Sequence, residues 1–193
     1  MEKIYNFLLT ILIIIAVIVG TMLIIKYGRN YINEKRLKEV VSKIEEQIKT
    51  AHDINQIENT YKGYIIDGII EIPKIDIKYP IINDTTDEAM KISVTKFWGP
   101  DQLNQIGNLS IAGHNNRDGT MFGKTKYLEI NDIIKITDLN NCTVEYKIFK
   151  IYTVDPNDVS YVDSVDETAR EVTLITCTKG HEERLIIKAR EIK

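Results

Sequence analysis

An uncharged apolar segment near the N-terminus is the strongest constraint on how this chain can fold. The 22 residues 4–25 include no charged side chain and consist mainly of Ile, Leu and Val. As an α-helix they would extend about 33 Å at ~1.5 Å per residue, enough to cross the hydrocarbon core of a bilayer. A cleaved secretory signal has a shorter apolar region and a small-residue cleavage site, and no such site follows Val19-Gly20. The sequence therefore predicts a membrane-lipid anchor over residues 1–25.

The charges around this segment bear on its direction in the membrane. Lys3 precedes the segment, and five basic residues follow it closely: Lys26, Arg29, Lys35, Arg36 and Lys38. Positive charge collects on the cytoplasmic side of a membrane helix. Flanking charge alone would therefore place the rest of the chain in the cytoplasm.

Charge and cysteine content exclude several classes of function. The net charge of −3 leaves no basic excess with which to neutralise phosphates, so we expect no nucleic-acid partner. Two cysteines, Cys142 and Cys177, are too few for a disulfide scaffold or a structural zinc site. No carboxylate cluster has calcium-site spacing. We therefore predict neither a metal nor a cofactor, and the sequence leaves open one bridge between the two cysteines.

Residues 26–62 are polar and charged, with apolar positions at helical spacing. These positions are Leu37, Val40, Val41, Ile44 and Ile48. Such spacing indicates an amphipathic helix. We expect a stalk helix and linker whose apolar stripe lies on the domain that follows, with a partner-binding helix as the alternative.

From residue 63 to residue 193 the pattern is that of a β domain. Residues 68–77 alternate apolar and polar side chains, as a half-buried strand does, and Pro73 suggests an edge position or a bulge. Further strands are expected at 108–112, 133–137, 143–154, 171–177 and 185–189, with short helices at 87–94 and 122–128. Many short strands and few helices predict a mainly β fold closed, or nearly closed, into a barrel.

A cysteine and an arginine stand at the ends of two successive predicted strands. Residues 172–176 favour a strand that stops near Cys177, because Lys179-Gly180 is a turn signal, and the next strand starts at Arg184. If the strands form a hairpin, Cys177 and Arg184 lie opposite each other on one face, with Cβ atoms ~5 Å apart.

That arrangement has a chemical meaning. A cation beside the sulfur favours the nucleophilic thiolate. The same guanidinium can donate hydrogen bonds to a carbonyl oxygen as negative charge builds on it. Alone, Cys177 would be a small buried apolar residue and Arg184 a solvated strand-end charge. Their spacing makes a catalytic pair the better interpretation.

A cysteine nucleophile needs a base or an ion-pair partner, and the chain has three histidines. His52 lies in the polar stalk, where a solvated surface residue is expected. His181 lies in the predicted hairpin turn and competes for the role. His114 follows Gly113 just beyond a strand, which would leave its imidazole on a positioned loop. From the residues alone, His114 is favoured only modestly over His181.

Several segments, taken together, resemble the sortase family. Thr-Leu-Ile-Thr-Cys177 followed by Arg184 resembles the Thr-Leu-x-Thr-Cys…Arg signature of sortases. Ile111-Ala-Gly-His114 resembles their histidine motif, and residues 68–75 are similar to their opening strand. The resemblance runs in the right order from Gly68 to the end of the chain.

The resemblance implies a fold and an activity. The fold would be the eight-stranded sortase β-barrel, with His114, Cys177 and Arg184 as its catalytic residues. The enzyme would be a cysteine transpeptidase, class D-like in preference to class B. Its catalytic domain would be exported to the outer side of the membrane, against the charge bias. Its partners would be the sorting-motif peptide of a surface protein and an amine of a peptidoglycan precursor or a pilin. Residues 156–170 would form the loop that selects the motif.

Two other functions remain as alternatives at this point. A thiol hydrolase would use the same residues and release the peptide to water. A non-catalytic, membrane-tethered barrel would bind envelope peptides without needing Cys177 as a thiol.

Overall fold

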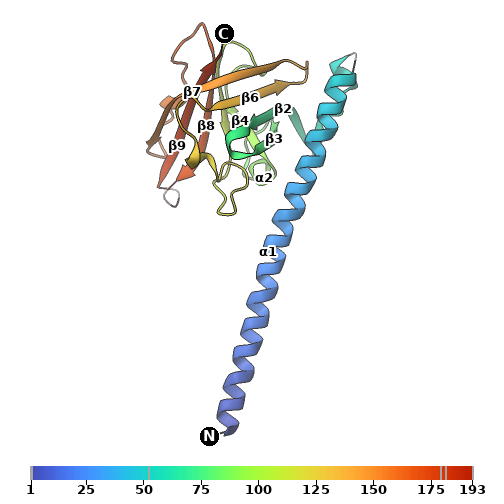
Figure 1. Ribbon diagram of the computed structural model, residues 1–193, viewed down its shortest axis with the longest axis vertical. Helices are drawn as coiled ribbons and strands as arrows, with labels where there is room; N and C mark the ends of the chain where they lie inside the picture. The colour runs from blue at the N-terminus through green and yellow to red at the C-terminus, as the bar shows by residue number, and fades with distance from the viewer. Residues whose placement is uncertain (1, 52, 179, 181, 193) are drawn as a thin grey trace. The chain divides into compact units, whose positions relative to one another are not determined.

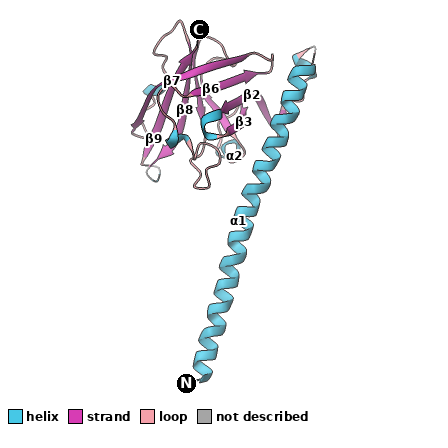
Figure 2. Ribbon diagram, in the orientation of Figure 1, coloured by secondary structure: helices cyan, strands magenta, loops and turns pink. Residues whose placement is uncertain are grey.

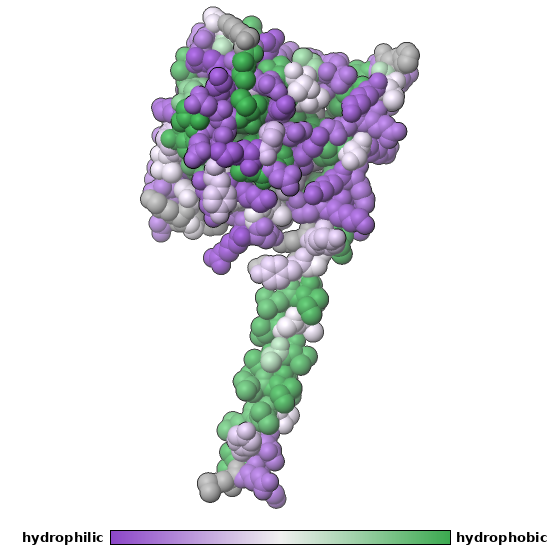
Figure 3. All heavy atoms as spheres, in the orientation of Figure 1, coloured by the Kyte–Doolittle hydropathy of each residue, from purple (hydrophilic) through white to green (hydrophobic). Residues whose placement is uncertain are grey.

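The computed structural model describes residues 2–51, 53–178, 180 and 182–192 and contains two compact units, Met1–Arg36 and Leu37–Lys193. Helix α1 (Glu2–Thr50) supplies the whole of the first unit and the beginning of the second. Its segment Glu2–Ile25 is long and apolar enough to cross a membrane, and none of it is buried within the protein. Figure 3 shows the surface of this segment as mainly hydrophobic, with hydrophilic atoms at its N-terminal end. The segment therefore fits a single-pass anchor.

Eight strands form a closed, mainly antiparallel barrel in the second unit (Figures 1 and 2). They are β2 (Tyr64–Ile72), β3 (Ile77–Ile82), β4 (Val94–Trp98), β5 (Gly107–Ala112), β6 (Ile133–Asp138), β7 (Thr143–Val154), β8 (Arg170–Thr178) and β9 (Glu183–Glu191). Their order is β2-β3-β4-β5-β8-β9-β7-β6, and β6 pairs back with β2. A two-residue strand, β1 (Thr60–Tyr61), adds to the edge of β2. The predicted eight-stranded barrel is confirmed.

Short helices connect some of these strands. Helix α2 is Asp87–Met90, and the 3-10 turns are η1 (Ile54–Gln56), η2 (Pro73–Ile75), η3 (Thr125–Tyr127) and η4 (Ser160–Val162). The helices expected at 87–94 and 122–128 are therefore shorter than predicted. Residues 68–77 are not one bulged strand, because Pro73 begins the turn η2 that joins β2 to β3. Strands β3 and β4 were not predicted.

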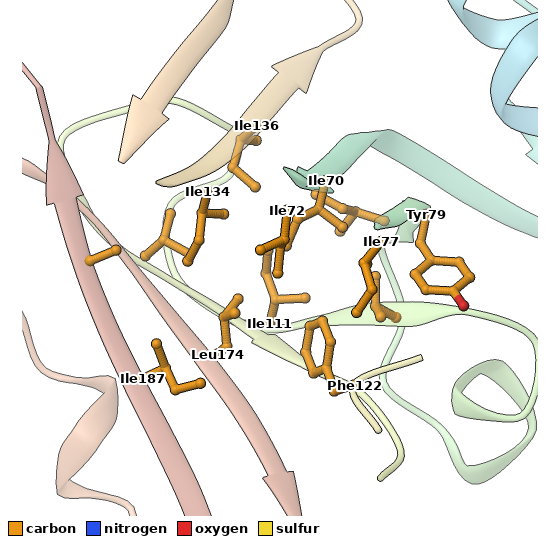
Figure 4. Packing of buried hydrophobic residues seen from close by; sticks show 14 of the residues in the cluster. Ile70, Ile72, Ile77, Tyr79, Ile111, Phe122, Ile134, Ile136, Leu174 and Ile187 are labelled. Atoms are coloured by element: carbon orange, nitrogen blue, oxygen red, sulfur yellow. The ribbon is translucent and has the colours of Figure 1, made fainter. Parts of the chain in front are cut away.

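The barrel interior is filled by aliphatic side chains. Figure 4 shows Ile70 and Ile72 of β2, Ile111 of β5, Leu174 of β8 and Ile187 of β9 converging on one another. All five are at most 1% exposed. Burying a side chain of this size contributes about 1.5–3 kcal/mol, so this layer holds the strands at the register that positions the site.

The C-terminal part of α1 belongs to the barrel unit. Val41, Ile44 and Ile48 are buried and pack with Ile66 and Ile69 of β2. The predicted apolar stripe thus lies on the barrel, as an amphipathic stalk helix should. The domain limits 1–25, 26–62 and 63–193 stay predictions.

Candidate active site

The pairing of β8 with β9 brings Cys177 and Arg184 together. The two strands are antiparallel, and Cys177 is the direct partner of Arg184, one pair before the last, Thr178 with Glu183. Both side chains are half-buried. The hairpin register predicted from the sequence is therefore confirmed, and it sets thiol and guanidinium on the same face of the sheet.

A parallel pairing brings His114 to the same end of the barrel. Strand β5 runs parallel to β8, with Ala112 opposite Ile175. Just beyond that pair, the amide of Gly113 donates to the carbonyl of Ile175 (3.1 Å), and the Thr176 hydroxyl donates to the Gly113 carbonyl (2.7 Å). The backbone before His114 is therefore fixed by the segment that leads into Cys177.

Gly113 is required for this close packing. A Cβ atom at this position would lie 2.8 Å from the Phe122 ring, closer than side-chain carbons approach in folded proteins. Phe122 in turn donates its amide to the carbonyl of His114 (2.9 Å). His114 is thus held from both sides, by β8 and by the segment that ends at Phe122.

His114, Cys177 and Arg184 line one cavity of about 220 Å³. Its apolar walls come from Met90, Phe97 and Tyr161, and its remaining lining includes His114, Cys177 and Arg184. Burial raises the pKa of the Tyr161 hydroxyl, and the positive charge of Arg184 partly opposes this. Tyr161 is therefore a neutral, mainly apolar wall at physiological pH.

Buried polar side chains of the barrel hold the wall that carries Tyr161. This wall is η4, within the loop 155–169 that joins β7 to β8. The Asn108 amide donates to the carbonyls of Tyr161 (3.1 Å) and Val162 (2.8 Å), and the Thr173 hydroxyl donates to the Asn108 side-chain oxygen (2.8 Å). Asn108 is 4% exposed and Thr173 is fully buried.

The next part of the same loop is held by two further buried groups. Lys188, 3% exposed, donates to the carbonyl of Asp163 (2.7 Å). The Glu171 carboxylate accepts the amide of Val165 (2.6 Å) and is paired with Arg190 (2.7 Å). Buried polar groups are costly unless bonded, so these contacts fix the loop conformation.

A larger cavity of about 510 Å³ is also lined by Cys177. Its lining includes Asn115, Arg117, Lys126 and Cys177. The Asn115 amide donates to the carbonyl of Cys177 (2.7 Å), which joins the segment after His114 to the end of β8. Asn115, Arg117 and Lys126 were not predicted from the sequence, although Asn115 and Arg117 lie in the His-Asn-Asn-Arg run that begins at His114.

The remaining sequence candidates are resolved in part. Cys142 is exposed and both cysteines are free thiols, so the possible bridge between them is not formed. His52 and His181 lie outside the described residues. Within the described part of the chain, no group of three His, Cys, Asp or Glu side chains is arranged to hold a metal ion. Tyr161 and Asn108 were also missed, although an asparagine in an otherwise apolar strand is a recognisable signal of a buried hydrogen-bond network.

Known proteins resemble this chain in sequence and in structure. Residues 70–192 match the family model for the sortase domain. The chain is 28% identical to sortase A of Staphylococcus aureus over the full length of both. It is 31% identical to sortase D of Bacillus subtilis over 57% of this chain and 53% of that protein.

The solved structure of a Clostridium perfringens sortase D5 transpeptidase has a TM-score of 0.69 and 26% identity, covering 81% of this chain and 98% of that one. The two sortase D relatives are consistent with the expected class D-like membership. The family match, the closed barrel and the cysteine–arginine pair at its rim agree. The chain belongs to the sortase family and is therefore a cysteine transpeptidase that acts on sorting motifs.

Proposed function

We propose that this enzyme is anchored by its N-terminal helix with its barrel outside the membrane, and that it uses Cys177, His114 and Arg184 to join surface proteins to an envelope amine. The observation that supports the three roles is the cavity that all three side chains line. No other described cysteine lines it, since Cys142 is exposed elsewhere.

In the first half-reaction, the Cys177 thiolate attacks a backbone carbonyl within the sorting motif of another protein. A C–S bond forms, and the carbonyl electron pair moves to oxygen, where the Arg184 guanidinium donates hydrogen bonds to it. When the tetrahedral intermediate collapses, the C–N bond breaks and the His114 imidazolium protonates the leaving amine. The product is a thioester on Cys177.

In the second half-reaction, an amine of a peptidoglycan precursor or of a pilin attacks the thioester carbonyl. The C–N bond forms and the C–S bond breaks, with the electron pair returning to sulfur. The neutral His114 imidazole accepts the proton that the amine loses. The same histidine thus acts as acid first and base second.

The motif would lie against Met90, Phe97 and Tyr161, so an apolar motif residue is expected there. The acidic residues of the loop are less suited to reading a basic motif residue. The carboxylates of Asp158 and Asp166 accept hydrogen bonds from Ser160 and Thr168 within their own turns. These local bonds favour a structural role for them.

The outside location rests on family membership, because the basic residues after the apolar segment favour the opposite direction. Protease treatment of intact cells tests it. Digestion of the barrel without lysis is expected, and a barrel protected until lysis would overturn the orientation.

The test of the reaction uses the full chain in detergent with a library of candidate sorting peptides. Intact-protein mass should reveal a thioester adduct that Cys177→Ala loses and Cys142→Ser keeps. Added amine should convert the adduct to an amide product. Release of free acid at an unchanged rate with amine present would favour the hydrolase instead, and no adduct with any peptide would contradict the proposal.

A further inference from the structure

Two cavities of different character share Cys177 in their linings. The smaller holds His114, Arg184 and the apolar wall of Tyr161, whereas the larger is lined by amide, small and basic residues. Cys177 belongs to both linings. A transpeptidase needs two substrates at one cysteine in succession, and two cavities lined by the same cysteine could each receive one of them.

The larger cavity has a one-sided charge. Arg117 and Lys126 contribute cations, and its described lining includes no acidic side chain. Neither residue forms an ion pair with any other described residue, while Lys126 lies over the Tyr127 ring. A concave surface with charge of one sign raises the local concentration of ions of opposite sign.

The backbone that carries Arg117 is tightly folded. Asn115 forms a β-bridge with Met121, and the Asn116 amide donates to the Thr120 hydroxyl (2.9 Å). A Cβ atom on Gly123 would lie only 2.2 Å from the Asn116 carbonyl oxygen. Only glycine fits there, so the end of this turn at Gly123 packs directly against its beginning at Asn116. This packing holds Arg117 at the cavity wall.

We propose that the larger cavity is the acceptor site, and that it selects an amine whose own molecule carries a carboxylate, which Arg117 and Lys126 bind. This rests on the proposed transpeptidase function and adds the chemical class of its second substrate. A simple alkylammonium ion would be repelled by the two cations. An amine with a carboxylate is drawn in by its anionic end, and its amine is then free to reach the thioester.

The chemistry of transfer is unchanged by this selection. The acceptor nitrogen forms a bond to the thioester carbonyl carbon, the C–S bond breaks with its electron pair on the Cys177 sulfur, and the released proton goes to His114. The carboxylate takes no part in bond formation. Arg117 and Lys126 are therefore acceptor-binding residues, separate from the reacting atoms.

Charge at the cavity can be measured without any substrate. Iodoacetate and iodoacetamide alkylate the same sulfur and differ in charge, so their rate ratio at Cys177 reports the local preference for anions. In the full chain in detergent, at fixed pH and low ionic strength, the double variant Arg117→Ala with Lys126→Ala should lower this ratio. The expected decrease is about fivefold if each charge acts across ~8 Å in a water-like dielectric. Arg117→Lys keeps the charge and should keep the ratio.

Lys135→Gln is the matched control, since it removes a cation from β6, outside the lining of both cavities. Lys135→Gln should leave the iodoacetate-to-iodoacetamide rate ratio at Cys177 unchanged. The corresponding ratio at Cys142 should be the same in every variant. If the double variant had the same rate ratio at Cys177 as the parent, the proposal that this cavity attracts anions would be wrong.

Acceptor selection is measured with 6-aminohexanoate and 6-aminohexanamide, whose amines are similar and whose far ends differ by one charge. With a peptide that acylates Cys177, the parent should transfer faster to the acid, and the double variant should lose that preference while forming thioester at the parent rate. Equal transfer to both amines by the parent would overturn the acceptor assignment. Absence of any thioester would instead overturn the proposed reaction, and the alkylation ratio would still report whether the cavity binds anions.

Discussion

Arg184 lies directly across the β8–β9 pair from Cys177, at the penultimate rung of that ladder. The pairing fixes the guanidinium beside the sulfur through backbone hydrogen bonds, without requiring a contact between the two side chains. The position of Arg184 beside Cys177 is therefore set by the strand pairing itself.

Replacing Arg184 tests this arrangement. Arg184→Ala should lower kcat for amide transfer by roughly 10²–10³-fold, the loss seen when one oxyanion donor is removed. Arg184→Lys should recover only part of it, because an ammonium lacks the planar fork of donors. Steady-state kinetics measure the effect, and parent-like transfer by Arg184→Ala would remove the arginine from the mechanism.

The choice between His114 and His181 can be made with paired variants. His114→Gln should abolish transfer, since no other described histidine lines the cavity, whereas His181→Gln should retain it. Alkylation of Cys177 in both variants shows whether the thiol remains accessible. The reverse pattern of activities would assign the acid and base roles to His181.

The wall that carries Tyr161 should depend on Asn108. Asn108→Ala leaves the carbonyls of Tyr161 and Val162 and the Thr173 hydroxyl without this partner, at a cost of ~1–3 kcal/mol for each buried group left unsatisfied. We expect a raised KM for the sorting peptide, a nearly unchanged kcat and faster hydrogen exchange at residues 161–165.

Ser93→Ala is the control for that experiment, because its buried hydroxyl also bonds a carbonyl, that of Pro80, outside the cavity lining. It should destabilise the barrel without raising KM. Equal KM effects in both variants would mean that Asn108 acts only through overall stability.

Lys188 should make stability depend on alkaline pH. Burial lowers the pKa of its ammonium below the usual 10.5, so the charged form is disfavoured in the folded state. The free-energy cost of burying this charge is fully present below the folded pKa. It decreases as pH rises from the folded pKa toward 10.5, because in this range the unfolded chain binds more protons than the folded protein does. The free energy of unfolding of the parent, relative to Lys188→Met, should therefore rise with pH across this alkaline window; a flat difference would contradict it.

The end of α1 should stabilise the barrel. Ile44 is 2% exposed among Val41, Ile48 and two isoleucines of β2, so Ile44→Ala should cost about 2–5 kcal/mol. Glu39→Ala, at an exposed position of the same helix, should cost little. A chain shortened to begin at residue 63 should melt well below one that begins at residue 37, and equal melting temperatures would support the predicted boundary at 63.

Local patterns predicted much of this fold. The β8–β9 register followed from a strand run, a turn signal and a second strand, because a short hairpin is specified by neighbouring residues. Strand β3 was missed because it carries Pro80 and is buried along nearly its whole length, which leaves no alternation to detect. Strand β4 is short, and a burial pattern that ends in exposed residues gives little period-2 signal.

The site was predictable only where its partners are close in sequence. Cys177 and Arg184 are joined by one turn, whereas His114 depends on the parallel pairing of β5 with β8 across a long stretch of chain. Nothing in the local sequence states which strands pair in parallel. For the same reason the contact of Asn108 with Tyr161, and the cavity beside Arg117, could be found only in three dimensions.

Strand β9 lies between β7 and β8 although it follows both in the chain. Until it is inserted, β7 and β8 each have an unpaired edge, and the cylinder remains an open sheet. Such an open sheet folds slowly, because its strands must pair across long stretches of chain. The same strand brings Arg184, so closure of the cylinder and arrival of the proposed oxyanion donor beside Cys177 are a single folding event.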